Sequence, residues 1–360
     1  QTQKRFSQEF RLTSQSDSKF QWMAGLYYED LQDEWYYGGN NPQLMETVSW
    51  PYAQYWAYYY NYYGYPVDYP MAPTTVNYSE TLDRQTEQMA IFGEVSYDIT
   101  DKWRVVGGAR WFEYDRYNYL KNQFPEGLPP WGTMDTDGAT LGQGKTSDIL
   151  WKGSVQYQID DSKMAYFLYS QGFRLGGFNS PRAVNTGLVP YEYDPDTMDN
   201  YELGLKSKWM GGRLLLNATL FHMKWSDYQQ GWGDVDGLWW LRGTFNAADV
   251  EQTGVELNTT FLFTDNLSAD FSLFYGSPEW SEDYWQPWQD PDEDPYIRKG
   301  MIMPNSPKWK GWGALNWVIP GLWGTNEAFI NYNITFQDET VNNLGNVSEQ
   351  DPDGIIPSWN

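Results

Sequence analysis

The chain of 360 residues is long enough for one large all-β domain or for two ordinary domains. Its formal net charge of −24 and its isoelectric point near 4.3 argue against nucleic-acid binding, which needs a basic surface to neutralise phosphates. There is no cysteine, and the only histidine is His222, so disulfide chemistry is excluded and a histidine-based catalytic or metal site has little support. We expect no enzyme activity, no metal and no cofactor.

The hydropathy of the chain is misleading when it is averaged. Aromatic residues make up 19% of the sequence, with 21 Trp and 29 Tyr, yet the mean hydropathy is −0.69. No segment approaches the ~20 apolar residues of a transmembrane helix. Abundant aromatic residues in a chain that is polar on average are typical of an outer-membrane β-barrel, because its wall alternates lipid-facing apolar residues with lumen-facing polar ones.

Apolar and polar residues alternate along about twelve segments, which predicts strands. In the segment 197–209, Leu203 and Leu205 share one face and Glu202 and Lys206 the other, so we expect the leucines to face lipid. In the segment 213–228 both faces carry apolar residues, so the pattern does not indicate which face meets lipid. The predicted strands are residues 3–13, 20–29, 85–99, 103–116, 147–159, 164–174, 197–209, 213–228, 249–264, 267–277, 306–319 and 326–338.

The connections between these strands alternate in length. Short turns are predicted at residues 14–19, 100–102, 160–163, 211–212 and 264–266. Long connections are predicted near residues 30–83, 117–146, 175–196, 229–248, 278–305 and 339–360. Strict alternation of this kind is typical of a barrel with periplasmic turns and extracellular loops. We therefore predict an all-β, antiparallel, up-and-down transmembrane β-barrel, of which this chain is a part.

Several segments resemble the barrel of TonB-dependent outer-membrane receptors. They are FSQEFRLTS at 6–14, WMAGLYYED at 22–30, IFGEVSYDITDKWRVVGGARW at 91–111, YSQGFRLGGFN at 169–179, YDPDTMDNYELGLKSKW at 193–209, NAADVEQTGVEL at 246–257 and MPNSPKWKGWGALNW at 303–317. Each is weak alone, but they span the chain in the family's order. The resemblance implies a barrel of about 22 strands around an N-terminal plug. This sequence shows no plug domain, TonB box or terminal aromatic strand, so we expect a central part of such a barrel.

The resemblance also implies a function. A receptor of this family sits in the bacterial outer membrane, in contact with its lipid, and imports a scarce large solute such as a siderophore, cobalamin or a glycan. Energy comes from a TonB-type protein acting through the plug region. Two alternatives stay open: a carbohydrate-binding β-protein at the cell surface, and a barrel that serves as a structural or adhesive surface protein without transport.

Rings are concentrated in the predicted long loops, where they are candidates for ligand contact. Aromatic faces can stack on sugars, planar ligands or cations. Packing between loops and contact with protein partners are the alternatives. The candidates are Trp35, Trp50, Trp56, Tyr59, Trp232, Trp239, Trp240, Trp280, Trp285 and Trp288.

Charged residues on the predicted polar faces form a second set of candidates. We expect them to line a wet lumen, where they pair with one another or with a plug; contact with the solute is the alternative. They are Arg104, Arg110, Lys152, Glu202, Lys206 and Lys208, and Arg174 in the GFRLGGF segment is similar.

Overall fold

The computed structural model describes residues 1–47, 49–63, 69–70, 75–123, 142–184, 186–233, 235, 241–322, 324, 326–341 and 355–356. Within these ranges, most of the regular structure is one antiparallel sheet. No helix among the described residues is long and apolar enough to cross a membrane.

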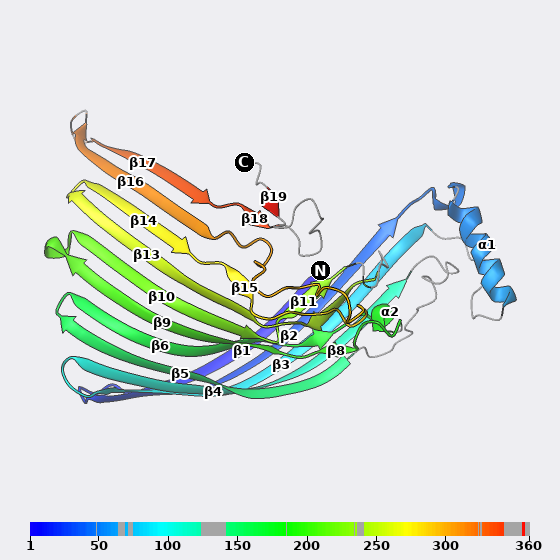
Figure 1. The fold of residues 1–360 in the computed structure, drawn as a ribbon, viewed down its shortest axis with the longest axis horizontal. Coiled ribbons are helices and arrows are strands. Elements are labelled where there is room, and N and C mark those ends of the chain that lie inside the picture. The colour runs from blue at the N-terminus through cyan, green and yellow to red at the C-terminus, as the bar shows by residue number, and fades with distance from the viewer. Residues whose placement is uncertain are drawn as a thin grey trace.

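The main sheet follows one path in which sequence neighbours are spatial neighbours (Figure 1). In order, its strands are β1 (Thr2–Thr13), β2 (Phe20–Asn40), β3 (Val76–Asp98), β4 (Trp103–Gln123), β5 (Gly142–Asp160), β6 (Lys163–Arg174), β9 (Asp196–Trp209), β10 (Leu214–Ser226), β13 (Val250–Thr264), β14 (Leu267–Tyr275), β16 (Trp309–Leu322) and β17 (Asn326–Gln337). A further strand, β15 (Pro278–Trp280), pairs with β13 beyond the end of β14. Each predicted strand corresponds to one strand of this path, and the antiparallel barrel wall is confirmed.

The sheet curves into a trough, with the short turns gathered at one end and the long connections at the other (Figure 1). Strands β1 and β17 lie at its two edges, and no ladder joins them within the described part of the chain, so this wall is open. The long connections carry the minor elements. These are η1 (Leu44–Glu46), α1 (Ser49–Tyr62), β7 (Gly177–Phe178), α2 (Pro181–Val184), β8 (Glu192–Tyr193), β11 (Gln229–Trp232), β12 (Gly243–Asn246), β18 (Thr340–Val341) and β19 (Ile355–Ile356), with η2 (Met210–Gly212) in a short turn.

Strands β2 and β3 are much longer than predicted. Their ladder continues past Glu34, which pairs with Asp83, as far as Asn40 and Val76. The connection predicted near 30–83 is therefore confined to residues 41–75, and β4 and β5 likewise extend to Gln123 and from Gly142. The alternation fades in these extensions because both faces are polar or aromatic, as expected for strands that rise out of the apolar band into water.

One cross-strand register defines the outer face of the wall. Phe167 pairs with Leu203, Leu203 with Leu220, Leu220 with Val255, and Val255 with Tyr275. Paired residues project from the same face of a sheet, so these five form one apolar rung. Leu203 and Leu220 are 57% and 50% exposed, as suits side chains that face lipid.

The register also assigns the faces of β10, which the sequence pattern left open. Leu220 lies on the outer face, whereas Phe221 pairs with Glu202 on the inner face and is buried. Gly254 makes room for the Phe221 ring. A Cβ atom at position 254 would lie 2.4 Å from Phe221 Cζ and 2.5 Å from the Tyr275 carbonyl oxygen.

We expect Gly254→Ala to destabilise the wall by about 1–3 kcal/mol, because the added methyl group overpacks a site bounded by backbone. Urea unfolding of the receptor in lipid vesicles measures the change. Gly153→Ala is the matched control, since a Cβ there meets nothing within 4 Å. Equal urea midpoints for Gly254→Ala and Gly153→Ala would show that the packing of Phe221 against Gly254 does not contribute to the stability of the wall.

Candidate functional site

Three long connections pack into a single hydrophobic cluster at the loop end of the wall. They join β6 to β9, β10 to β13, and β14 to β16 (Figure 1). We call this cluster the loop core; its buried members are Ala183, Val189, Trp232, Val235, Leu241, Phe245, Ala248, Val250, Trp280, Ile297 and Met303. Because each connection contributes buried residues, each is ordered by the other two.

Stacked rings form the centre of the loop core. Trp232 stacks on Tyr284 with ring centroids 5.5 Å apart and planes inclined by 17°, and Trp288 and Tyr296 meet it edge-on. Trp280 meets Tyr228 edge-on at 5.5 Å. Burial of each large side chain contributes about 1.5–3 kcal/mol, and the same burial raises the pKa of the Tyr284 phenol. These rings therefore hold the loops together.

An ion pair with a buried carboxylate lies at the base of the loop core. Asp196 begins β9 and pairs with Arg174 at the end of β6. The Asp196 carboxylate is fully buried, and Arg174 Nε lies 2.9 and 3.1 Å from its two oxygens. The Gln229 backbone N–H donates to the same carboxylate at 3.0 Å. The Arg174 guanidinium lies 4.4 Å from the Trp225 ring centroid and 4.6 Å from that of Tyr228, so charge and rings stabilise one another.

Two asparagine side chains tie the connections to each other. Asn179 Nδ2 donates to the carbonyls of Pro190 and Thr244, at 2.9 and 2.8 Å, while its Oδ1 accepts the Thr244 N–H at 2.7 Å. Asn246 Nδ2 donates to the Asp194 carbonyl at 3.0 Å. Sequence reasoning missed Asp196 and both asparagines. The sequence indicates only that Asp and Asn side chains often form hydrogen bonds with the backbone of loops. This tendency does not reveal which backbone groups Asp196, Asn179 and Asn246 bind.

The predicted loop tryptophans have different environments. Trp232 and Trp280 are 5% and 1% exposed, and their indole Nε1 atoms are buried without an acceptor among the described residues. Trp288 packs against the same cluster, whereas Trp285 is 41% exposed and donates to the Glu293 carbonyl. Ligand contact stays a prediction for this set, and Trp285 is the best placed for it. The predicted residues Trp239 and Trp240 lie outside the described residues.

The remaining predicted rings belong to the long β2–β3 arm. Trp35 lies within β2, opposite Leu82, rather than in a loop. Trp50, Trp56 and Tyr59 lie on α1, which stands apart from the loop core at the far end of the arm (Figure 1). This helix has no charged residue, and most of its tyrosines are exposed.

The charged residues predicted to face the lumen share one face of the wall. The register places Arg104, Arg110, Lys152, Glu202, Lys206 and Lys208 together on the side opposite the apolar rung. Lys152 Nζ lies 2.8 Å from Glu94, and Arg104 Nε lies 2.6 Å from Asp98. Lys206 lies over the Tyr166 ring. Pairing within the wall accounts for these contacts, and solute contact stays a prediction.

Neither face offers a metal site in the part of the chain that the structure describes. No group of three or more His, Cys, Asp or Glu residues there is placed to hold a metal ion. The single histidine, His222, lies on the outer face with its Nδ1 atom 2.9 Å from Thr253 Oγ1.

Comparison with known proteins agrees with this architecture. The family model described as "TonB dependent receptor-like, beta-barrel" matches residues 2–360. Pesticin receptors of Yersinia enterocolitica and Yersinia pestis are each 24% identical over 259 residues, which is 70% of this chain and 33% of theirs. The chain thus spans about a third of the length of these curated relatives.

Solved structures show the same fold. The ferric yersiniabactin uptake receptor from Yersinia pestis superposes with a TM-score of 0.66 at 18% identity, covering 96% of this chain and 44% of that one. The ferric preacinetobactin receptor from Acinetobacter baumannii superposes with a TM-score of 0.59 at 16% identity, again covering 96% of this chain and 44% of that one. Proteins of this family are barrels of the bacterial outer membrane. The chain belongs to the TonB-dependent receptor family, as part of its β-barrel domain.

Proposed function

We propose that this chain supplies the wall and the extracellular loops of an outer-membrane receptor that imports a ferric siderophore with energy from a TonB-type protein. In the membrane, the long connections then lie on the extracellular side and the short turns on the periplasmic side. The loop core is the observation that carries the proposal. It is a preordered group of three loops fixed to one side of the wall, and preordering lowers the entropic cost of ligand capture.

Two lines of reasoning favour a ferric siderophore among large solutes. The solved structures named above are receptors for ferric yersiniabactin and ferric preacinetobactin. In addition, the exposed Trp285 ring next to the loop core offers a flat face to an aromatic or planar chelate.

A glycan is the second candidate, favoured by α1. Its exposed tyrosines combine an apolar face with a hydroxyl group, on a helix without charges. Such a surface suits the alternating apolar and hydroxyl-bearing faces of sugars. It would equally suit an adhesive role without transport.

Deletion of the reading frame that encodes this chain is expected to abolish uptake of one ferric siderophore by the source bacterium under iron limitation. Accumulation of radioactive iron from individual labelled chelates measures the effect. A plasmid copy should restore uptake, and deletion of the TonB gene should reproduce the loss. A defect in growth on a glycan with unchanged iron uptake would favour the second candidate, and uptake that persists without TonB would contradict energised transport.

A further inference from the structure

The backbone ladder of the wall divides at the loop end, between β5 and β6. Below this point Lys152 pairs with Ser170, and the two strands stay paired down to their turn. Above it, among the described residues, β5 pairs only with β4, as far as Gly142, and β6 pairs only with β9, as far as Arg174. We call this division the fork. It separates the side of the wall that carries the β2–β3 arm from the side that carries the loop core.

The edge of β5 in the fork is closed by side chains rather than by a neighbouring strand. The Trp151 N–H donates to Gln171 Oε1 across the fork at 3.1 Å, and the Ile149 N–H donates to the adjacent Asp148 Oδ1 at 2.7 Å. Trp151 and Ile149 are two residues apart, so both N–H groups point towards β6. Side-chain oxygens therefore replace the carbonyls of a strand that has moved away.

Three rings join the two sides of the fork. Phe112 on β4 stacks on Phe173 on β6, with ring centroids 4.1 Å apart and planes inclined by 8°. Tyr114 meets Phe173 edge-on at 5.8 Å, and Phe112 is only 1% exposed. Packed rings thus take the place of the backbone hydrogen bonds that join these strands lower down.

A latch lies beyond the rings and joins β4 and β5 to the connection between β6 and β9. The Phe178 ring of that connection lies against two glycines of β5. A Cβ atom at Gly142 would lie 2.3 Å from Phe178 Cγ, and one at Gly144 would lie 3.1 Å from Phe178 Cζ. The Arg116 guanidinium lies 5.5 Å from the Phe178 ring centroid, and its Nη1 donates to the Gly176 carbonyl. We call Arg116 and Phe178 the latch.

The closed latch leaves polar atoms unsatisfied. No ion pair joins Arg116 to another described residue. Its Nε atom and the Oδ1 atom of Asn118, two residues farther along β4, are buried without a hydrogen-bond partner among those residues. Such atoms are destabilising when buried, because water would satisfy them in an open state. The rings favour a closed fork and these two atoms favour an open one.

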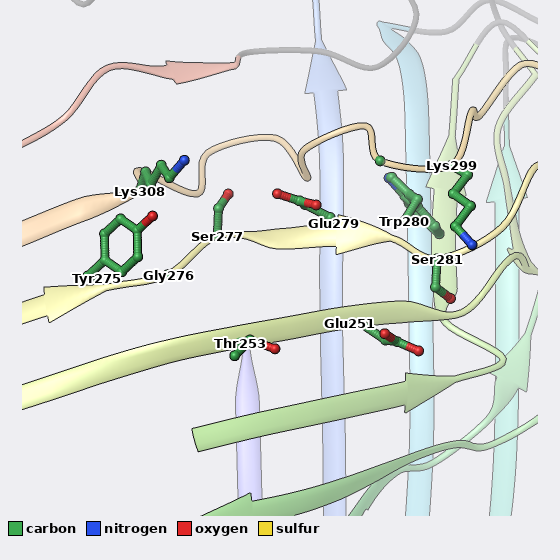
Figure 2. A pocket seen from close by; sticks show the side chains of 11 residues that line it. Glu251, Thr253, Tyr275, Gly276, Ser277, Glu279, Trp280, Ser281, Lys299 and Lys308 are labelled. Atoms are coloured by element: carbon green, nitrogen blue, oxygen red, sulfur yellow. The ribbon is translucent and has the colours of Figure 1, made fainter. Parts of the chain in front are cut away.

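A second interruption of the wall is braced in a different way. Strand β14 ends at Tyr275 and β15 resumes at Pro278, with Gly276 between them beside a pocket of about 350 Å³ (Figure 2). Backbone hydrogen bonds tie this gap to the segment that leads to β16. The Gly276 N–H donates to the Lys308 carbonyl and the Met303 N–H donates to the Pro278 carbonyl, each at 2.9 Å. Side-chain contacts alone bridge the fork within the described part of the chain, so the fork is the weaker of the two joints.

We infer that the fork is a joint at which the loop end of the barrel opens and closes, with Arg116 and Phe178 as the latch that holds it shut. In the open state the β2–β3 arm and the loop core are farther apart, and the entrance between them is wider. The inference requires neither a siderophore nor energy from a TonB-type protein, so failure of the uptake assay leaves it standing.

Distances between spin labels test the inference, and the absence of cysteine from this chain simplifies labelling. Nitroxides at Ser147→Cys on β5 and Thr197→Cys on β9 lie on the two sides of the fork, at exposed positions. The complete receptor is reconstituted in nanodiscs, and double electron–electron resonance gives the distance distribution. We expect a closed population and a longer, open one. The pair Val155→Cys and Leu203→Cys joins the same two strands below the fork, through Phe167, and should give a single narrow distance.

Loss of the latch should shift the balance towards the open state. Arg116→Gln removes the guanidinium and Phe178→Ala removes the ring. Each should raise the ratio of open to closed populations about tenfold, as expected for the loss of one charge-assisted contact. Arg104→Gln is the control, because Arg104 lies on the same face of β4 but pairs with Asp98 next to a short turn. An unchanged distance below the fork shows that each variant keeps its wall folded.

Three results would overturn the inference. A single distance across the fork in the unmodified receptor and in both latch variants would show that the fork does not open. Equal population ratios in Arg116→Gln and Arg104→Gln would show that the latch does not control it. Two populations for the pair below the fork would show that any movement belongs to the whole wall.

Discussion

Replacement of Asp196 by asparagine is expected to loosen the loop core while the barrel stays folded. The change keeps the shape of the side chain but removes its charge, so Arg174 loses its partner between Trp225 and Tyr228. Breaking a fully buried pair costs about 3–5 kcal/mol, but the Arg174 side chain left behind is 40% exposed, so we expect a loss of about 1–3 kcal/mol. Limited proteolysis should then cut the three connections of the loop core, and binding of the proposed siderophore should be lost.

The ion pair between Arg213 and Asp265 provides the matched control. It joins two short turns at 4.0 Å, and the Asp265 side chain is fully exposed. Exposed pairs contribute about 0–1 kcal/mol, so Asp265→Asn should change neither proteolysis nor binding. Protease resistance of Asp196→Asn equal to that of the unmodified receptor would show that the pair does not hold the loops.

Replacement of Trp232 by alanine is expected to have the second large effect, and comparison with Trp285→Ala separates packing from ligand contact. Loss of the Trp232 ring removes its stack on Tyr284 and leaves a cavity, at a cost of about 3–5 kcal/mol. Hydrogen exchange should accelerate in all three connections, because each depends on the others for burial.

Trp285→Ala should leave hydrogen exchange in the loop core unchanged, since its side chain is partly exposed. If Trp285 contacts the siderophore as proposed, affinity should fall about tenfold, as expected for an aromatic binding residue. Titration calorimetry with the ferric siderophore identified by the uptake assay measures the affinity. An unchanged affinity would remove this ring from the ligand site.

The sequence predicted the wall well because a two-residue period is a direct consequence of strand geometry. Leu203 and Glu202 lie on the faces that alternation predicted. The same rule could not assign β10, since Leu220 and Phe221 are both apolar. Only the pairing of Phe221 with Glu202, above the space left by Gly254, decides its face.

The loop core lay beyond sequence reasoning because its contacts follow no period. The abundance of rings indicated either packing or ligand contact, but no pattern in the sequence states that Trp232 stacks on Tyr284, fifty-two positions away. The pairing of Arg174 with Asp196 was equally hidden, because it follows from the register of β6 with β9. The extension of β2 and β3 was missed for a related reason: strands that leave the membrane lose the contrast between their two faces.

The length of β2 and β3 makes the two sides of the loop end of the wall differ in what holds them. The loop core is held by rings packed between three connections and by the Arg174–Asp196 pair. The β2–β3 arm is held by its backbone ladder, which β4 accompanies as far as Ser79, and it carries α1 at its end (Figure 1). Loss of one side chain therefore disturbs several connections on the first side, whereas the ladder of the arm depends on no single side chain.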